Sequence, residues 1–237
     1  MLLNLDAGEL DTEPEELWAL ADILCIACGG HAGDAESMTR VVRFCVDRQR
    51  TGHRPPRLGA HPSYPDRAGF GRISRAPRTV DEHRSLAASI VEQCDALASI
   101  ARSHGVGVDY IKPHGALYHD ANADAELART VIEGARTALG LEVCVIGPPT
   151  GALRDAALRD ALAVDNCYLR EMFADRRARP DGTLVPRSEP NALITDPTVA
   201  ASRARELVAA NAADTICCHA DTPGALTIVS AVRTALS

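Results

Sequence analysis

The sequence predicts an α/β fold in which seven parallel strands alternate with helices throughout residues 1–237. Short apolar runs are separated by amphipathic stretches, which is the pattern of parallel β/α architecture. The chain has no low-complexity linker, shift in composition or internal repeat, so we expect a single domain. A TIM-like barrel and an open doubly wound sheet both fit this pattern, and both place an active site at the carboxyl ends of the strands.

Seven segments are predicted to be strands, because each is a short and mainly apolar run. They are Leu2–Asp6, Ile23–Gly29, Arg57–Pro62, Val108–Pro113, Glu142–Gly147, Asn166–Glu171 and Thr215–His219. The helices are expected in the longer amphipathic segments that lie between these runs.

The clearest predicted helix is Thr79–His104, where apolar residues recur at helical spacing. Further helices are predicted at Asp34–Gln49, Asn122–Leu139 and Val199–Ala210. Asp34 is suited to cap the helix that it begins. Asp196 and Pro197 introduce the last of these helices in N-cap and first-turn positions.

Composition argues against two classes of partner. The formal net charge is −7 and the pI is about 5.6, whereas a nucleic-acid partner calls for a basic patch. No apolar run is long enough to suggest a membrane span. The N-terminus turns acidic without a positively charged region, so we expect no signal peptide and a cytoplasmic protein.

The eight cysteines are expected to be free thiols, as is usual in a reducing cytoplasm. Cys25 and Cys28 form a C-x-x-C pattern inside an apolar, strand-like run. Positions three apart on a strand point to opposite faces, so we favour core packing for this pair over a zinc or redox site.

Polar side chains follow six of the seven predicted strands. Because the carboxyl ends of parallel strands meet at one mouth, these groups are expected to converge, which favours an enzyme. The residues, in chain order, are Asn4, Asp6 and Glu9; His31 and Asp34; His61, Tyr64 and Asp66; Lys112 and His114; Glu171, Asp175 and Arg176; and His219 and Asp221.

Lys112 is the only lysine in the chain, and it lies at the end of a strand two residues before His114. An ammonium and a guanidinium are not interchangeable, so a lone lysine among arginines indicates a place where an ammonium is needed. Codon usage is the alternative explanation. We favour a site residue because of the polar groups expected around it.

Asp6, His31, His61 and His219 offer a mixed oxygen and nitrogen ligand set that suits a hydrolytic divalent metal. Their spacing matches no local zinc motif, so this hypothesis depends on convergence in the fold. The chain also lacks a P-loop, because its only lysine is followed by proline, and it lacks a G-x-S-x-G elbow.

Two long segments allow two interpretations each. Gly59–Arg72 is rich in Gly, Pro and aromatic residues and suits either a functional loop or a rigid cover. Phe173–Arg187 is charged and rich in turn residues, and suits either a lid or a solvated hairpin. His53, His83 and His104 fall on or beside predicted helices, and we expect them to be solvated.

Six motifs occur in order along nearly the whole chain: NLDAGE, IACGGHAGD, GAHPSYPDRAGFGR, IKPHGALY, EMFADR followed by DGTLVPR, and CHAD. Together they resemble the LamB/YcsF family, which comprises the A subunits of 5-oxoprolinase. This resemblance implies a seven-stranded β/α barrel of the glycoside hydrolase and deacetylase type. It also implies cleavage of 5-oxoproline to glutamate with ATP and its Mg²⁺ counter-ion, in company with two partner subunits.

The resemblance suggests roles for residues of this chain. Lys112 would hold a substrate carboxylate or a phosphate, and His61 or His114 would act as general base or acid. Asp6 and Glu171 would position water, protons or a metal. Residues expected to contact the substrate, 5-oxoproline or a related lactam, are Asn4, His31, Tyr64, Arg72, Asp175, Arg176 and His219.

The chain departs from the family pattern at five positions: Cys25, Gly30, Ala178, Asn191 and Ala220. The family usually has Asn, Phe, Tyr, Gly and Gly there, and a longer segment between residues 9 and 24. Several of these positions flank the expected site. Two alternatives therefore stand beside the ATP-dependent lactam hydrolase: a metal-dependent, deacetylase-like amidohydrolase acting on another small amide or lactam, and a non-catalytic subunit.

Overall fold

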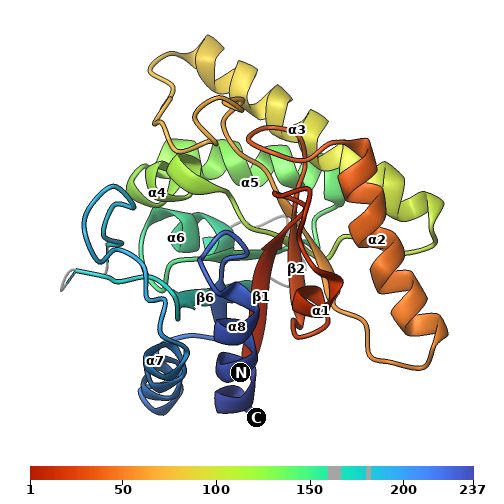
Figure 1. Cartoon of the computed structure of the whole chain (residues 1–237). Coiled ribbons are helices and arrows are strands. Elements are labelled where there is room, and N and C mark those ends of the chain that lie inside the picture. The colour runs from red at the N-terminus through yellow and green to blue at the C-terminus, as the bar shows by residue number, and fades with distance from the viewer. Residues whose placement is uncertain (160–166, 180–182) are drawn as a thin grey trace.

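A computed structural model of the chain describes residues 1–159, 167–179 and 183–237. Its seven strands form a closed parallel barrel in chain order, and β7 pairs with β1 to complete the ring. The predicted barrel is thereby confirmed. Figure 1 shows β1 and β2 side by side, with helices around them. The strands are β1 (Leu2–Ala7), β2 (Ile23–Ala27), β3 (Arg57–His61), β4 (Tyr110–Ile111), β5 (Cys144–Gly147), β6 (Tyr168–Phe173) and β7 (Thr215–Cys218).

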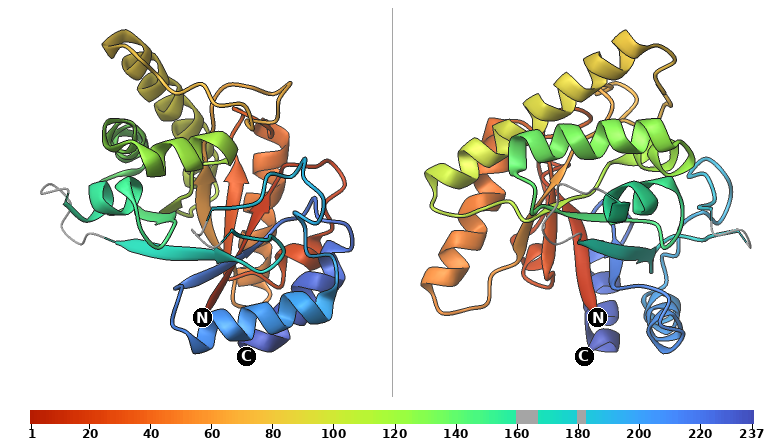
Figure 2. Two further views of the ribbon diagram at one scale, coloured as in Figure 1. Left: turned by 90° about the vertical axis from the view of Figure 1, so that its left-hand side faces the viewer. Right: turned by 180° about the vertical axis from the view of Figure 1, so that it is seen from behind.

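Helices surround the barrel, and Figure 2 shows both chain termini near the end where β1 begins. Within the described residues, none of the helices has the length and apolar character that crossing a membrane requires. The helices are α1 (Glu15–Trp18), α2 (Ala35–Arg50), α3 (Val80–Ser103), α4 (Gly115–Ala123), α5 (Ala125–Leu139), α6 (Ala152–Arg159), α7 (Pro197–Ala209) and α8 (Ala225–Leu236).

Two of the predicted helix starts are confirmed. The Asp34 carboxylate accepts the backbone N–H of Ser37 and caps α2. The Asp196 side chain caps α7, with Pro197 as its first residue. Each cap satisfies backbone donors that have no partner within the helix.

The helix predicted at Asn122–Leu139 is confirmed as α5, but it begins at Ala125, three residues later than expected. Asp124 has an extended backbone and ends α4, and its side chain accepts the N–H groups of Glu126 and Leu127 to begin α5. A carboxylate at an N-cap outweighs the continuous helical pattern around it. The strand predicted to begin at Asn166 has its first residue outside the described part of the chain.

The expectation that all eight cysteines are free thiols is also wrong for one pair. Cys144 and Cys167 form a disulfide, and the other six cysteines are free and buried. Val145 of β5 pairs with Tyr168 of β6, so the residues that precede them lie side by side. Pairing between strands brings these two cysteines together, and spacing in the sequence does not show it.

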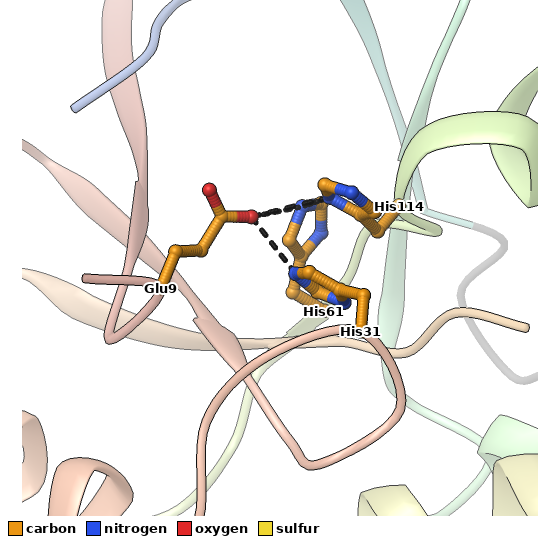
Figure 3. A group of neighbouring side chains, drawn as sticks. All are labelled: Glu9, His31, His61 and His114. Carbon is orange, nitrogen blue, oxygen red and sulfur yellow. Dashed lines mark hydrogen bonds and ion pairs between the residues drawn. The ribbon is translucent and has the colours of Figure 1, made fainter. Parts of the chain in front are cut away.

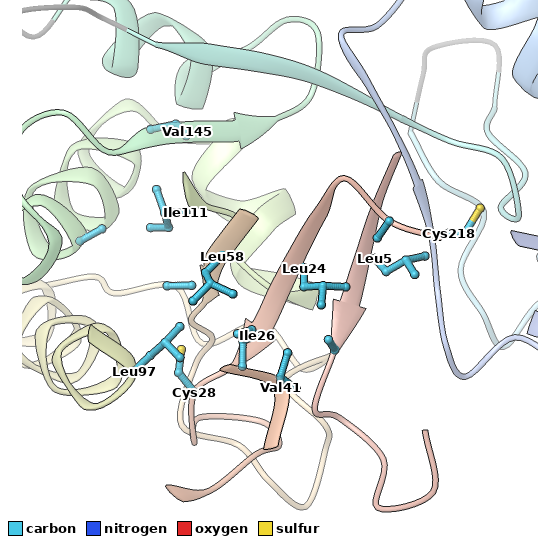
Figure 4. Packing of buried hydrophobic residues seen from close by; sticks show 14 of the residues in the cluster. Leu5, Leu24, Ile26, Cys28, Val41, Leu58, Leu97, Ile111, Val145 and Cys218 are labelled. Carbon is cyan, nitrogen blue, oxygen red and sulfur yellow. The ribbon is translucent and has the colours of Figure 1, made fainter. Parts of the chain in front are cut away.

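Side chains on the outer face of the barrel form the main hydrophobic core with the helices. Figure 4 shows Leu5, Leu24, Leu58 and Val145 among them. A second apolar cluster, which includes Ile23, Cys25, Tyr110, Cys144 and Ile146, is formed by strand residues of the opposite parity. Cys28 belongs to the main core and Cys25 to the second cluster, as the predicted opposite faces require.

Candidate active site

The polar strand ends converge on one cavity of about 780 Å³. Its lining includes the side chains of Asp6, His61, Lys112, Glu171 and His219, which come from the ends of five different strands or the residues just after them. Successive inward-facing residues on a strand are two apart, and Lys112 and Glu171 lie two positions beyond Tyr110 and Leu169, which belong to or pack against the second apolar cluster. The cavity therefore has a polar floor on an apolar base.

Lys112 lies at the centre of this floor and is only 2% exposed. Its Nζ donates to Asn4 Oδ1 at 3.0 Å, contacts the Asp6 carboxylate, and lies 3.3 Å from Glu171 Oε1. Cys217 Sγ is 3.4 Å away. An ammonium has three N–H donors for these three oxygens, whereas a planar guanidinium is larger and points its donors in one plane.

The charges around Lys112 keep this layer ionised. Burial alone would lower the pKa of Lys112, but Asp6, Cys217 and Glu171 outweigh it and raise the pKa well above its ordinary value. Burial alone would raise the pKa of Asp6, but His61 and Lys112 hold it well below its usual range. The lysine remains a cation and Asp6 remains a carboxylate.

His61 and His114 are held by the backbone. His61 Nδ1 lies 2.6 Å from the carbonyl oxygen of Lys112, and His114 Nε2 lies 3.0 Å from that of Phe70. A carbonyl only accepts, so these ring nitrogens carry the hydrogens. The remaining nitrogens, His61 Nε2 and His114 Nδ1, face each other at 3.0 Å.

Glu9 joins this pair from the loop after β1, as Figure 3 shows. Its Oε1 lies 3.2 Å from His114 Nδ1, 3.8 Å from His61 Nε2 and 2.9 Å from His31 Nε2. The rings of His31 and His114 stack in parallel, with centroids 3.5 Å apart. Burial would raise the pKa of Glu9, but its contacts with His114 and His31 outweigh it and lower the pKa strongly.

His219 forms a second acid–base unit with Asp175. The fully buried Asp175 carboxylate accepts the backbone N–H of His219 at 2.9 Å, lies 3.0 Å from its Nδ1, and accepts the Thr222 hydroxyl at 2.7 Å. Burial would lower the pKa of His219, but Asp175 outweighs it and raises the pKa. Nδ1 is thus the protonated nitrogen, and Nε2 lies 3.9 Å from Asp6 Oδ2.

Three arginines line the cavity above the floor. Arg72 and Arg187 both bond to Asp221, at 2.8 Å. Arg176 donates to the carbonyl oxygen of Val185 at 2.8 Å, and its Nε has no hydrogen-bond partner among the described residues. Burial, together with the charge of Arg187, lowers the pKa of Arg176 to about 10. The arginines provide an anion-binding side.

The segment predicted to be a lid or a hairpin carries two of these arginines. It forms isolated antiparallel bridges between Arg176 and Leu193 and between Ala178 and Leu184, with residues 180–182 outside the described part. Residues 183–188 contribute to the cavity lining. This segment therefore covers the site on one side.

All five residues expected to be catalytic line the cavity, namely Asp6, His61, Lys112, His114 and Glu171. Arg72, Arg176 and His219 line it as well. Asn4, His31 and Asp175 lie behind these residues and bond to Lys112, Glu9 and His219 respectively.

Tyr64 does not fit its expected contact with substrate. Its side chain is buried, and its hydroxyl donates to Asp120 Oδ2 at 2.8 Å; neither residue is among those that line the cavity. The proposed metal set is also divided. His31 and His61 group with Glu9 and His114, whereas Asp6 and His219 group with Cys217.

The sequence alone assigns no role to Glu9, although this residue closely follows the first strand. Gly8 has φ 71°, which turns the chain so that Glu9 reaches the histidines. The buried Glu13 carboxylate holds this turn by accepting the N–H groups of Gly8, Glu9 and Leu10 and the indole N–H of Trp18. The glycine before Glu9 was the available signal.

A sequence model of the LamB/YcsF family matches residues 3–237. The chain belongs to the LamB/YcsF family. It is 38% identical to the A subunit of 5-oxoprolinase from Methylococcus capsulatus, in a match that covers 99% of this chain and 91% of that protein. It is 40% identical to the A subunit from Chloroflexus aggregans, in a match that covers 98% of this chain and 92% of that protein. The crystal structure of the lactam utilization protein from Thermus thermophilus superposes with a TM-score of 0.84 at 30% identity, over 100% of this chain and 95% of that one.

The structure accounts for three departures from the usual LamB/YcsF pattern. A Cβ at Gly30 would lie 2.4 Å from Gln93 Oε1, and Gln93 hydrogen-bonds in both directions to the Ser63 backbone. Asn191 has φ 63°, which asparagine tolerates where the family usually has glycine. Cys25 packs in the second apolar cluster. Nothing in the described residues explains Ala178 or Ala220.

The Glu13 carboxylate is predicted to be essential for the loop that carries Glu9. Glu13→Ala leaves four donors without their acceptor, so it should reduce the free energy of unfolding by about 3 kcal/mol or more, as measured in urea. The exposed Glu16 is the control, and Glu16→Ala should change stability by less than ~0.5 kcal/mol. Equal losses in the two variants would contradict this role.

Proposed function

We propose that this LamB/YcsF protein is the A-type subunit of a 5-oxoprolinase, which opens the lactam of 5-oxo-L-proline to L-glutamate with hydrolysis of ATP. The names of its relatives support this family role. The observation that carries the proposal is a cavity in which the buried Asp175–His219 pair faces the floor carboxylates while arginines supply an anion-binding side.

Energy coupling follows from the chemistry of the substrate. A lactam is an unreactive amide, and its opening to glutamate is uphill. Transfer of the ATP phosphoryl group to the amide oxygen makes the ring carbon electrophilic. Water adds to that carbon, the ring C–N bond breaks as the nitrogen takes a proton, and hydrolysis of the acyl phosphate releases phosphate.

His219 is the best-placed general base for the attacking water. Asp175 holds its Nδ1–H, which leaves Nε2 with the lone pair directed away from that carboxylate. Asp6 lies 3.9 Å from Nε2 and is suited to orient the water. We therefore assign the base to His219, whereas the sequence alone suggests His61 or His114.

We assign the binding of the substrate carboxylate or phosphate to the arginines, whereas the family resemblance suggests Lys112. Lys112 is already paired with Asp6 and Glu171, so its charge is not free for a substrate carboxylate or phosphate. Arg72 and Arg176 both line the cavity, and the Arg72 side chain remains 41% exposed.

Assembly with other chains is part of the proposal. The relatives from Methylococcus capsulatus and Chloroflexus aggregans are each named as one lettered subunit of 5-oxoprolinase, which supports a multi-subunit enzyme. We propose two partner subunits for this chain, in agreement with the family resemblance.

ATP turnover that depends on 5-oxoproline tests the proposal directly. The chain, combined with its two partner subunits, should hydrolyse ATP only when 5-oxoproline is present, and His219→Asn should reduce kcat by about 10²- to 10⁴-fold. The exposed His53 provides the matched control, because His53→Asn should leave turnover unchanged. Turnover by the partner subunits without this chain would assign it a non-catalytic role instead.

The Asp175–His219 pair also predicts a change in pH dependence. A base acts when it is unprotonated, and Asp175 raises the pKa of His219, so activity should rise with pH through a value above that of an ordinary histidine. Asp175→Asn removes this charge and leaves Asp6 and Arg187 facing His219, so the acid limb should move to lower pH while kcat falls. An unmoved acid limb in a folded Asp175→Asn variant would contradict the assignment.

A further inference from the structure

We propose that Glu9, His61 and His114 form a site for one divalent metal ion of the zinc class. His61 Nε2, His114 Nδ1 and Glu9 Oε1 lie 3.0, 3.2 and 3.8 Å from one another. Ligands at zinc distances of about 2.0–2.1 Å in a tetrahedron are about 3.4 Å apart. The three atoms already stand near this spacing.

The orientation of the two imidazoles supports the site independently. Each ring donates its other N–H to a backbone carbonyl, from Lys112 or from Phe70. Such second contacts are typical of metal-binding histidines, because they fix the tautomer and turn the lone pair to the metal. When both rings are neutral, two lone pairs face each other at 3.0 Å, which is repulsive unless a cation lies between them.

The charge balance of the floor also supports a bound cation. The side chains of Asp6, Glu9 and Glu171 are no more than 4% exposed, and the only buried ammonium beside them is Lys112. Glu171 Oε1 lies 3.3 Å from Lys112 Nζ, whereas Oε2 has no hydrogen-bond partner among the described residues. Buried carboxylates need compensating charge, so this layer has room for a further cation.

His31 is placed as a positioning residue and not as a ligand. Its ring is parallel to that of His114, within 2°, and two parallel rings cannot both direct in-plane lone pairs to one point. Its Nε2 instead bonds to Glu9 Oε1. This arrangement corrects the ligand set suggested by the sequence, which combined His31 and His61 with Asp6 and His219.

The ligand set indicates the class of metal and its access. Two imidazoles and one carboxylate suit Zn²⁺ or Co²⁺ and are poor for Mg²⁺, which prefers oxygen ligands. Glu9, His61 and His114 all line the cavity, so a metal there would keep a coordination position open to it. The site does not depend on the proposed reaction, since binding is measured without turnover.

Metal binding to the chain alone tests the inference. The chain, stripped with a chelator and titrated with Co²⁺, should bind one equivalent with visible d–d absorption, and Zn²⁺ should displace it. His61→Asn and His114→Asn should each weaken Co²⁺ binding by at least about 100-fold, and His31→Asn by about 10- to 100-fold. The exposed His53 supplies the control variant, His53→Asn, which should bind as the unaltered chain does.

Two results would overturn the site. Absence of saturable Co²⁺ binding would show that a shared proton, and not a metal, separates the two histidines. Binding that survives in both His61→Asn and His114→Asn would place the ion elsewhere. If metal binds as expected while 5-oxoproline-dependent turnover is absent, the proposed function fails and the metal site stands.

Discussion

The buried ammonium of Lys112 is the interaction on which the rest of the site depends. It joins Asn4 and Asp6 of β1 to Glu171 of β6 across the interior of the barrel. Without it, two almost fully buried carboxylates would remain, which is costly unless their charge is compensated. The ammonium therefore allows a polar, ionised floor to exist above an apolar cluster.

Two clusters of acid–base side chains lie on either side of Asp6. Asp6 Oδ2 lies 3.4 Å from His61 Nε2 and 3.9 Å from His219 Nε2. On one side, backbone carbonyls fix His61 and His114 beside Glu9. On the other side, a buried carboxylate fixes His219. Both arrangements orient a lone pair in advance, and such preorganisation is what a rigid barrel offers to a site built from several strand ends.

Much of the fold and part of the site could be predicted from the sequence. Alternating apolar and amphipathic segments identified the seven strands, and the position of Lys112 after a strand placed it in the site. The boundary between α4 and α5 at Asp124 and the disulfide of Cys144 were missed. Each depends on a local hydrogen bond or on pairing between strands, and periodicity carries no information about either.

The roles of the site residues could also be predicted only in part from the sequence. A position after a strand places a residue near the mouth, but the direction of its side chain depends on its neighbours. Tyr64 turns to Asp120 and does not reach the cavity. Glu9 reaches the histidines because Glu13 holds the intervening turn. The order of the family motifs identified the chain, but it did not separate contact residues from those behind them.

The free energy of unfolding of Lys112→Met, measured in urea, tests the central role of the ammonium most directly. The account predicts a loss of about 3–5 kcal/mol, because two buried carboxylates lose their partner. Adding Asp6→Asn and Glu171→Gln to Lys112→Met should recover much of this loss. Lys112→Arg should have a lower free energy of unfolding than the unaltered chain. If Lys112→Met unfolds within ~0.5 kcal/mol of the unaltered chain, or if the added substitutions deepen the loss, the floor does not depend on this ion pair.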